Sequence, residues 1–259
     1  MQKQDAPLAE GPDDSDQRAR WSAIWKNSMA ASNAGVIKKL MKSLYRTVVP
    51  QATFNHYLFR WLKGWVRLAE CNVLEIGGGG GLGQVLGSRV RSYALLDYAE
   101  SAIELAREVL RDTPNARCML GDMFEYAPAE RYDLVISVGL IEHFFGADKE
   151  RCMRAHKNLS RRYVCIAAPA DSPRNWWRHF RFQTTKEYPN QRPVSERELF
   201  DLCLTLKMSP VAMTRLDPWY ALRQGFFARS WRQCYAAWFP AGHAVECPTG
   251  GILAMLAEV

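Results

Sequence analysis

The sequence predicts an α/β protein with a doubly wound, mostly parallel sheet of about seven strands, the last of them antiparallel. Two observations predict this class. Short apolar segments alternate with helical stretches through the middle of the chain, and the first apolar segment runs directly into five consecutive glycines at 77–81. Alternation of this kind places crossover helices on both faces of a parallel sheet. With 259 residues, 48% of them hydrophobic, the chain can build the core of one large domain.

The elements follow in a regular order. Strands are predicted at 73–77, 93–97, 117–120, 132–138 and 163–168, with helices at 82–89, 99–111 and 147–160. A helix at 195–207 and strands at 211–216 and 251–258 complete the sheet. Ser195 and Glu198 have the spacing of a capping box at the start of the 195–207 helix.

The remaining segments are assigned around this core. Residues 1–17 are polar and are predicted to be a disordered tail, while 18–259 form a single domain. Within it, 18–69 is a helical cover, 70–168 a cofactor-binding core, 169–194 an insert after the fifth strand, and 195–259 the C-terminal part of the sheet. We expect the cover and the insert, with its Trp176 and Trp177, to build a second pocket beside the cofactor.

Composition limits the cellular location and the kinds of ligand that we expect. No apolar run approaches the roughly 18 to 20 residues of a membrane helix, and we expect neither a signal peptide nor a membrane anchor. Seven cysteines without a Cys-x-x-Cys pair favour a reducing, cytoplasmic location over a disulfide framework or a zinc site. The formal net charge is +7, and residues 151–240 hold 16 Lys or Arg against 6 Asp or Glu. That half would attract an anionic substrate, a lipid surface or RNA, unless its charges are simply solvated.

The glycine run fits two templates. Gly78, Gly80 and Gly83 satisfy the dinucleotide fingerprint, in which a pyrophosphate rests on a helix N-terminus. Glu75, with Gly77, Gly79 and Gly81, fits a pattern with an acid at the end of the strand. A carboxylate there would repel a pyrophosphate but suit a ligand with an ammonium or sulfonium group, which favours the second template. Asp97, about twenty residues on, is placed to accept ribose hydroxyls in either case.

With these motifs, the chain resembles the class I (Rossmann-like) methyltransferases that use S-adenosylmethionine, chiefly over residues 70–168. The resemblance implies S-adenosylmethionine as cofactor, with Asp97 on the ribose, Tyr98 against adenine, Asp122 near the adenine amino group and Met123 beside the ring. It also places Ser137, at the end of the fourth strand, in the cofactor site. The segment 140–143, Leu-Ile-Glu-His, is similar to the turn of family members that act on small molecules.

Departures from the family refine the expectation. Ser-Val-Gly-Leu at 137–140 differs from the Asn or Asp, two prolines and an aromatic typical of members that methylate bases in nucleic acids. We therefore expect a small-molecule acceptor, an oxygen or nitrogen of a possibly acidic metabolite, and no nucleic acid. Ser137 is a poor magnesium ligand, which predicts a reaction without metal. The oligomeric state is left open.

His143 is the candidate general base, because it directly follows the fourth strand. A histidine that orients the turn or packs near the cofactor is the alternative. Two rival functions also stay open at this point. One is a nicotinamide-dependent oxidoreductase, from Gly78, Gly80, Gly83 and Asp97; the other is a methyltransferase or binding protein that acts on RNA or on a membrane-associated lipid or glycan.

Overall fold

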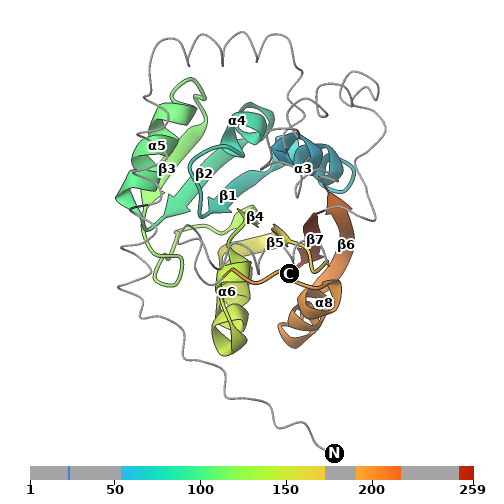
Figure 1. Cartoon of the computed structure of the whole chain (residues 1–259). Helices are drawn as coiled ribbons and strands as arrows, with labels where there is room; N and C mark the ends of the chain where they lie inside the picture. Colours follow the sequence, from blue (N-terminus) through green and yellow to red (C-terminus); the bar gives the residue numbers. More distant parts are fainter. Residues whose placement is uncertain (1–22, 24–53, 173–190, 217–250) are drawn as a thin grey trace, which may run out of the picture.

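A seven-stranded sheet organises the protein, and its strands follow the order β3-β2-β1-β4-β5-β7-β6 (Figure 1). The computed structural model describes residues 54–172, 191–216 and 251–259, together with Ala23. The strands are β1 (Asn72–Ile76), β2 (Ser92–Asp97), β3 (Ala116–Leu120), β4 (Tyr132–Val138), β5 (Ser160–Pro169), β6 (Ser209–Leu216) and β7 (Ile252–Glu258). Strands β1 to β5 are parallel, whereas β7 runs antiparallel to both β5 and β6. The predicted fold class is confirmed.

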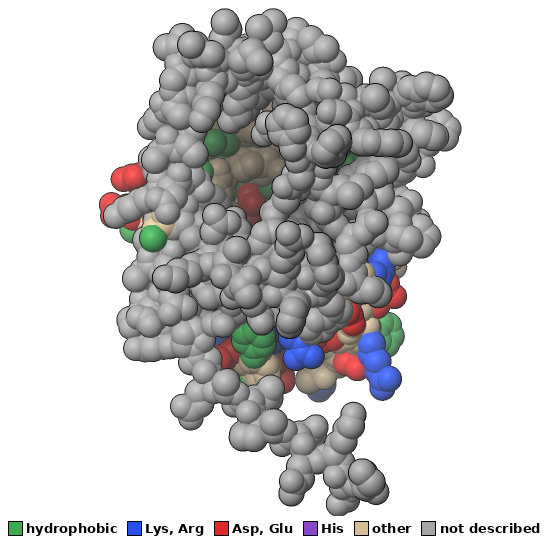
Figure 2. Space-filling view, in the orientation of Figure 1, with side chains coloured by type: hydrophobic (Ala, Val, Ile, Leu, Met, Phe, Trp, Pro, Cys, Tyr) green, Lys and Arg blue, Asp and Glu red, His purple; other side chains and the backbone are tan. Residues whose placement is uncertain are grey.

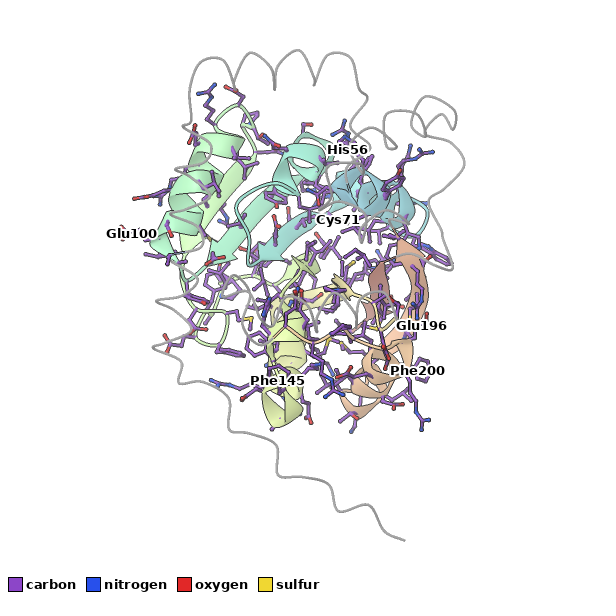
Figure 3. All side chains as sticks on the ribbon, in the orientation of Figure 1. His56, Cys71, Glu100, Phe145, Glu196 and Phe200 are labelled. Atoms are coloured by element: carbon purple, nitrogen blue, oxygen red, sulfur yellow. The ribbon has the colours of Figure 1, made fainter. Side chains whose placement is uncertain are left out.

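Helices cover both faces of the sheet (Figure 1). On one face lie α3 (Phe54–Lys63), α4 (Gly83–Leu86) with the 3-10 turn η2 (Gly87–Arg89), and α5 (Glu100–Leu110). The other face carries α6 (Gly146–Leu159) and α8 (Glu196–Thr205). Two further 3-10 turns, η1 (Leu68–Glu70) and η3 (Ile141–His143), precede β1 and follow β4. In Figure 3, Glu100 and Phe200 mark the outer sides of α5 and α8, where both side chains are exposed.

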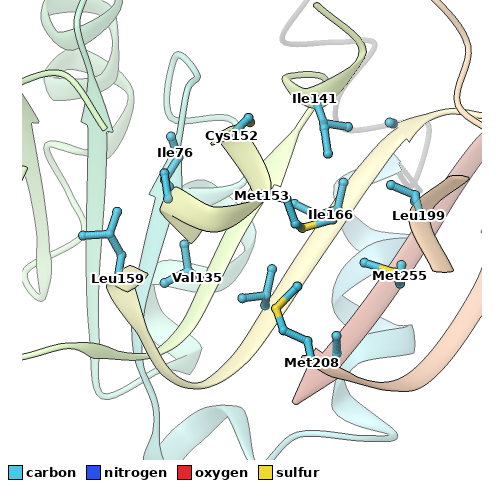
Figure 4. Close-up of a cluster of buried hydrophobic side chains, with 14 of the residues drawn as sticks. Ile76, Val135, Ile141, Cys152, Met153, Leu159, Ile166, Leu199, Met208 and Met255 are labelled. Atoms are coloured by element: carbon cyan, nitrogen blue, oxygen red, sulfur yellow. The ribbon is translucent and has the colours of Figure 1, made fainter. Parts of the chain in front are cut away.

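Each face has its own apolar core, because successive strand residues point to opposite sides. In β1, Val73 packs with Leu58 of α3 and Leu110 of α5, whereas Leu74 and Ile76 join the core under α6 and α8. Figure 4 shows this second core, in which Met153 of α6, Ile166 of β5 and Met255 of β7 meet. The sheet is therefore buried on both sides, and chemistry is confined to its edges.

Several element boundaries differ from the prediction, most of them by one or two residues. The helix predicted at 82–89 is only four residues of α4 followed by η2, as expected for a stretch containing two poor helix formers, Gly83 and Gly87. β5 starts at Ser160 rather than 163, and β6 starts at Ser209 rather than 211. Pro210 is tolerated there because β6 is an edge strand.

Only one of the two hydrogen bonds of the predicted capping box forms at the start of α8. Ser195 Oγ accepts the Glu198 backbone N–H at 3.1 Å, as predicted. The Glu198 carboxylate does not return to the Ser195 backbone but accepts a hydrogen bond from Lys149 Nζ of α6 at 2.6 Å. The Lys149 side chain is almost fully buried, so its charge needs this partner. The start of α8 is thereby fixed to α6.

Several predictions lie outside the described residues. They are the 1–17 tail, nearly all of the cover at 18–53, the middle of the insert at 173–190, and residues 217–250 of the C-terminal part. The two described ends of the insert meet, since Ala170 and Val194 form an isolated parallel bridge. None of the described helices has the length and apolarity to cross a membrane.

Candidate active site

The glycine loop joins β1 to α4 at the carboxyl edge of the sheet and packs without side chains against its neighbours. Gly80 has φ +82°, and a Cβ atom placed on it would lie 3.2 Å from Ala106 Cα of α5. A Cβ atom on Gly83 would lie 2.6 Å from Tyr93 Cε1 of β2. Glycine is needed at both positions, the first for its backbone conformation and the second for close packing. Gly77 and Gly78 also have positive φ values, whereas neither Gly79 nor Gly81 does.

Asp97, the last residue of β2, ties this loop to the next turn. Gly78 N–H donates to its Oδ2 at 2.9 Å, and Ala99 N–H donates to its Oδ1 at 2.8 Å. Burial raises the pKa of Asp97, and these backbone N–H groups oppose that rise. A carboxylate has about four acceptor sites, so two hydroxyl donors can still be accommodated. The residue fits the ribose role that the sequence predicts for it.

Glu75 lies beneath the loop rather than at its surface. It is buried on the α5 side of β1, where the Tyr93 hydroxyl donates to Glu75 Oε2. A Cβ atom on Gly78 would lie 2.9 Å from Glu75 Oε1, which places the carboxyl directly under the loop. Burial, and to a lesser extent the charge of Asp97, raise the pKa of Glu75 to about 8. The sequence predicted that Glu75 would suit a cationic ligand. In the structure Glu75 also has a hydrogen-bond partner in the core, the Tyr93 hydroxyl.

The turn after β3 lies beside Asp97, because Gly121 N–H donates to the Asp97 carbonyl at 3.0 Å. Asp122 Oδ1 accepts the Phe124 backbone N–H at 2.9 Å, which makes it a turn-forming residue as well as a candidate ligand for adenine. Met123 is buried in the core under α6, and Tyr98 is half-buried directly after Asp97. All four residues of the predicted adenosine site thus lie at the ends of two neighbouring strands.

Ser137, near the end of β4, faces α6. Its hydroxyl is fully buried and lies 2.9 Å from His156 Nε2, while His156 Nδ1 lies 2.8 Å from the Cys152 carbonyl. Only a protonated Nδ1 can donate to that carbonyl, so Nε2 accepts from Ser137. Burial lowers the pKa of His156 to about 4, which keeps the ring neutral. Because the Ser137 side chain is engaged, a cofactor would meet this position through the backbone.

The turn at 139–143 adjoins the glycine loop. Gly139 N–H donates to the Ala167 carbonyl of β5 at 2.8 Å, and a Cβ atom on Gly77 would lie 3.3 Å from Leu140 Cδ1. His143 is buried at the end of this turn, and desolvation lowers its pKa to about 4. A neutral imidazole is the form that can accept a proton.

Glu142 was not predicted as a site residue, although it lies in the family-like Leu-Ile-Glu-His segment. It is fully buried, and burial raises its pKa to about 7. Its side chain accepts a hydrogen bond from Gln191 at 3.1 Å, and its carbonyl accepts one from Arg192 N–H at 3.0 Å. The end of the insert is therefore held against the turn after β4, a long-range contact that sequence spacing does not reveal.

The predicted residues thus converge on one edge, with two qualifications. The residues that lie at the carboxyl ends of β1, β2 and β3 or in the loops that follow are Gly77, Gly79, Gly81, Asp97, Tyr98 and Asp122. Glu75 and Ser137 lie near this edge too, but their side chains are buried and already hydrogen-bonded, Glu75 to Tyr93 and Ser137 to His156. Within 54–172, 191–216 and 251–259, no group of three His, Cys, Asp or Glu residues is arranged to hold a metal ion.

Comparison with known proteins supports a common assignment. Residues 73–162 match a family model described as a methyltransferase domain. The fold is similar to that of magnesium protoporphyrin IX methyltransferase from Synechocystis PCC 6803 with bound SAH, with a TM-score of 0.62 and 12% identity over 95% of this chain and 99% of that chain. It is also similar to DhpI in complex with SAH, with a TM-score of 0.57 and 12% identity over 92% of this chain and 95% of that chain.

A putative methyltransferase from Bacillus halodurans C-125 is a further structural relative, with a TM-score of 0.55 and 10% identity over 78% of this chain and 97% of that chain. A search of the curated proteins finds no match. At these identities the solved structures show a shared fold, and the family match over 73–162 favours a methyl donor over a nicotinamide at the glycine loop. Residues 73–162 thus carry a methyltransferase domain, and the chain has the fold of methyltransferases solved with bound SAH or S-adenosylmethionine.

Proposed function

We propose that this enzyme transfers the methyl group of S-adenosylmethionine to an oxygen or nitrogen of a small, acidic metabolite in the cytoplasm. The observation that carries the proposal is the contact between two loops. Leu140, in the turn after β4, lies against Gly77 of the glycine loop, and His143 ends that same turn. A methyl donor over the glycine loop would then face the 139–143 turn.

The residues that would hold the cofactor are those around Asp97. Asp97 would accept the ribose hydroxyls, Asp122 and Met123 would border the adenine together with Tyr98, and the backbone of Gly77, Gly79 and Gly81 would lie under the methionine part. Glu75 beneath the loop would supply negative charge once a cationic donor above it favours its ionised form. When bound, the cofactor supplies a methyl group activated by a sulfonium.

A small acceptor is supported by the residues after β4. Residues 137–140 contain neither the Asn or Asp nor the two prolines that are typical of methyltransferases acting on nucleic-acid bases. The surplus of Lys and Arg at 151–240 supports an acidic metabolite, because such a field raises the local concentration of anions. RNA or a membrane-associated lipid remains the alternative that the same charge would favour.

The chain's own contribution to the reaction is positioning and proton transfer. Methyl transfer is an in-line displacement, so the 139–143 turn must hold the acceptor lone pair on the axis of the breaking bond and exclude water. His143, neutral because desolvation lowers its pKa to about 4, is the proposed proton acceptor if the acceptor loses a proton.

A direct test is release of S-adenosylhomocysteine from S-adenosylmethionine in the presence of phenols, amines, carboxylic acids and sugar nucleotides. We expect turnover with one chemical class and calorimetric binding of S-adenosylhomocysteine without any acceptor. Binding of NAD in place of S-adenosylhomocysteine would contradict the cofactor site. Salt-sensitive binding of RNA without turnover of any small acceptor would contradict the substrate class.

The role of His143 is tested with two variants. If it is the base, His143→Ala and His143→Gln should both lower kcat by about a hundredfold or more, because neither side chain can take the proton. Affinity for S-adenosylhomocysteine should stay unchanged in both. Recovery of activity in His143→Gln would instead assign His143 a hydrogen-bonding role in the turn.

A further inference from the structure

Glu142 is the buried acid of this edge whose hydrogen bonding is incomplete. Gln191 Nε2 donates to Oε1 at 3.1 Å, whereas Oε2 is buried and has no hydrogen-bond partner among the described residues. The residue is 0% exposed. A buried carboxyl oxygen without a hydrogen-bond donor lowers the stability of the folded protein. Such an atom therefore calls for an explanation in terms of function.

The nearest cation does not complete the site. Lys149 of α6 is close enough to favour the charged form of Glu142 and so lowers its pKa slightly, against the larger effect of burial. Its Nζ, however, donates to Glu198 Oε1 of α8 at 2.6 Å. Burial, and to a lesser extent the charge of Glu142, raise the pKa of the buried Cys152 thiol on α6. Glu142 therefore keeps one buried carboxyl oxygen that no described donor satisfies.

The position of Glu142 connects it to the transfer site. Its Oε1 lies 3.4 Å from where a Cβ atom on Gly139 would be, so the carboxyl folds back over the start of the turn. The next residue of that turn, Leu140, contacts Gly77 of the glycine loop. On the other side, Gln191 and Arg192 bring the end of the insert against the same carboxyl and its backbone.

We propose that Glu142 Oε2 binds a hydrogen-bond donor of the methyl acceptor, either a hydroxyl or an ammonium group, and so determines which acceptors enter. The inference rests on the proposed function and specifies its substrate. A carboxylate would be repelled at this point, because two like charges in a desolvated site oppose each other. The acidic group of the metabolite would then lie away from Glu142, and its reacting end would carry an O–H or N–H bond.

The test compares simple methyl acceptors of similar shape: benzylamine, benzyl alcohol and phenol, which carry a hydrogen-bond donor, and benzoate, which carries none at neutral pH. S-adenosylhomocysteine release is measured for the full chain and for Glu142→Gln, which keeps the shape and removes the charge. Glu150→Gln is the matched control, because Glu150 is a more exposed carboxylate on α6 that pairs with Arg154. Unfolding midpoints and calorimetric binding of S-adenosylhomocysteine are recorded for all three proteins.

We expect turnover of at least one probe that carries a hydrogen-bond donor, at least tenfold above benzoate. Glu142→Gln should lower kcat/KM for that probe about a hundredfold, mainly through KM, while Glu150→Gln and S-adenosylhomocysteine affinity stay within twofold of the unmodified chain. If Glu142→Gln does not fold, the preference of the unmodified chain for donor probes decides alone.

Two results would overturn the inference and leave the proposed function intact: turnover of benzoate in preference to the probes with a hydrogen-bond donor, or an unchanged kcat/KM in a folded Glu142→Gln. Absence of turnover with every small acceptor would remove the proposed substrate class, and the role of Glu142 with it. Calorimetric binding of S-adenosylhomocysteine separates that result from loss of the cofactor site.

Discussion

Asp97 has two tasks, and a substitution will affect both. Its oxygens accept N–H groups from Gly78 and Ala99, and the proposed ribose hydroxyls would use the remaining acceptor sites. Asp97→Ala should weaken S-adenosylhomocysteine binding by about 1 to 3 kcal/mol, the cost of leaving polar groups unpaired. It should also destabilise the protein by a similar amount for the same reason. Calorimetry and urea unfolding measure the two effects; unchanged affinity in the folded variant would remove Asp97 from the cofactor site.

Glu75 should link ligand binding to proton release. Its pKa is raised to about 8, so the carboxyl is mostly protonated at pH 7, and a cationic ligand above it would favour the ionised form. We expect S-adenosylmethionine binding at pH 7 to release a fraction of a proton, seen as a dependence of the calorimetric enthalpy on buffer ionisation. Glu75→Gln should lose this dependence. Equal proton release in both proteins would show that another group responds.

At the scale of elements, the glycine loop offers a matched pair of substitutions. Gly80 has a positive φ and packs against α5, whereas Gly81 is exposed and has an ordinary φ. Gly80→Ala should cost roughly 1 to 3 kcal/mol of stability and displace the loop from α5, because alanine is strained in that conformation. Gly81→Ala should change stability by less than about 1 kcal/mol. Equal unfolding midpoints for the two variants would contradict the loop conformation.

The cap of α8 makes a second prediction at this scale. Ser195→Ala removes the acceptor of the Glu198 N–H and should lower stability by about 1 kcal/mol. Ser195→Asp should restore most of the loss, since aspartate is an equally good cap. Because α8 is joined to α6 through Lys149 and Glu198, hydrogen exchange should increase at the start of α8 in the alanine variant. Loss of protection throughout the sheet would instead indicate global unfolding.

For the whole molecule, four buried groups predict how stability depends on pH. The pKa of His143 and of His156 is lowered to about 4, so the unfolded chain binds more protons between pH 4 and 6.5, and stability rises with pH there. The pKa of Glu75 is raised to about 8 and that of Glu142 to about 7, so the folded chain binds more protons above pH 4.5, and stability falls with pH until about 8. The opposing trends overlap below pH 6.5, and only the decline remains above it.

We therefore expect the free energy of unfolding to fall by about 1 to 3 kcal/mol between pH 6.5 and 8. Glu75→Gln and Glu142→Gln together should flatten this decline, because they remove both carboxyls. Urea titrations at a series of pH values measure it. A rise in stability over that interval would contradict the burial of these acids.

Charge is a second property of the whole molecule. Figure 2 shows Lys and Arg interspersed with Asp and Glu toward the end of the molecule where α6 and α8 lie, rather than a continuous basic surface in this view. Ion pairs such as Arg215 with Glu196 and Arg161 with Asp133 account for part of this mixing. On the described surface, part of the basic charge is thus paired locally with acidic side chains.

The sheet and the position of the glycine loop could be predicted from the sequence alone, because both depend on local patterns. Apolar alternation gave the strands and helices within a few residues, and strand-end acids such as Asp97 followed from spacing along the chain. The backbone requirement at Gly80 and the close packing at Gly83, however, are shared by both glycine templates, so glycine spacing alone could not separate a methyl donor from a dinucleotide.

Which side chains already have hydrogen-bond partners can be seen only in the folded protein. Tyr93 meets Glu75 across two strands, His156 meets Ser137 from α6, and Gln191 reaches Glu142 from the far end of the insert. Such pairs join residues 18 to 49 positions apart and leave no periodic trace in the sequence. Burial, which sets the charge state of each of these groups, is a property of the packed sheet and its helices and not of any segment alone.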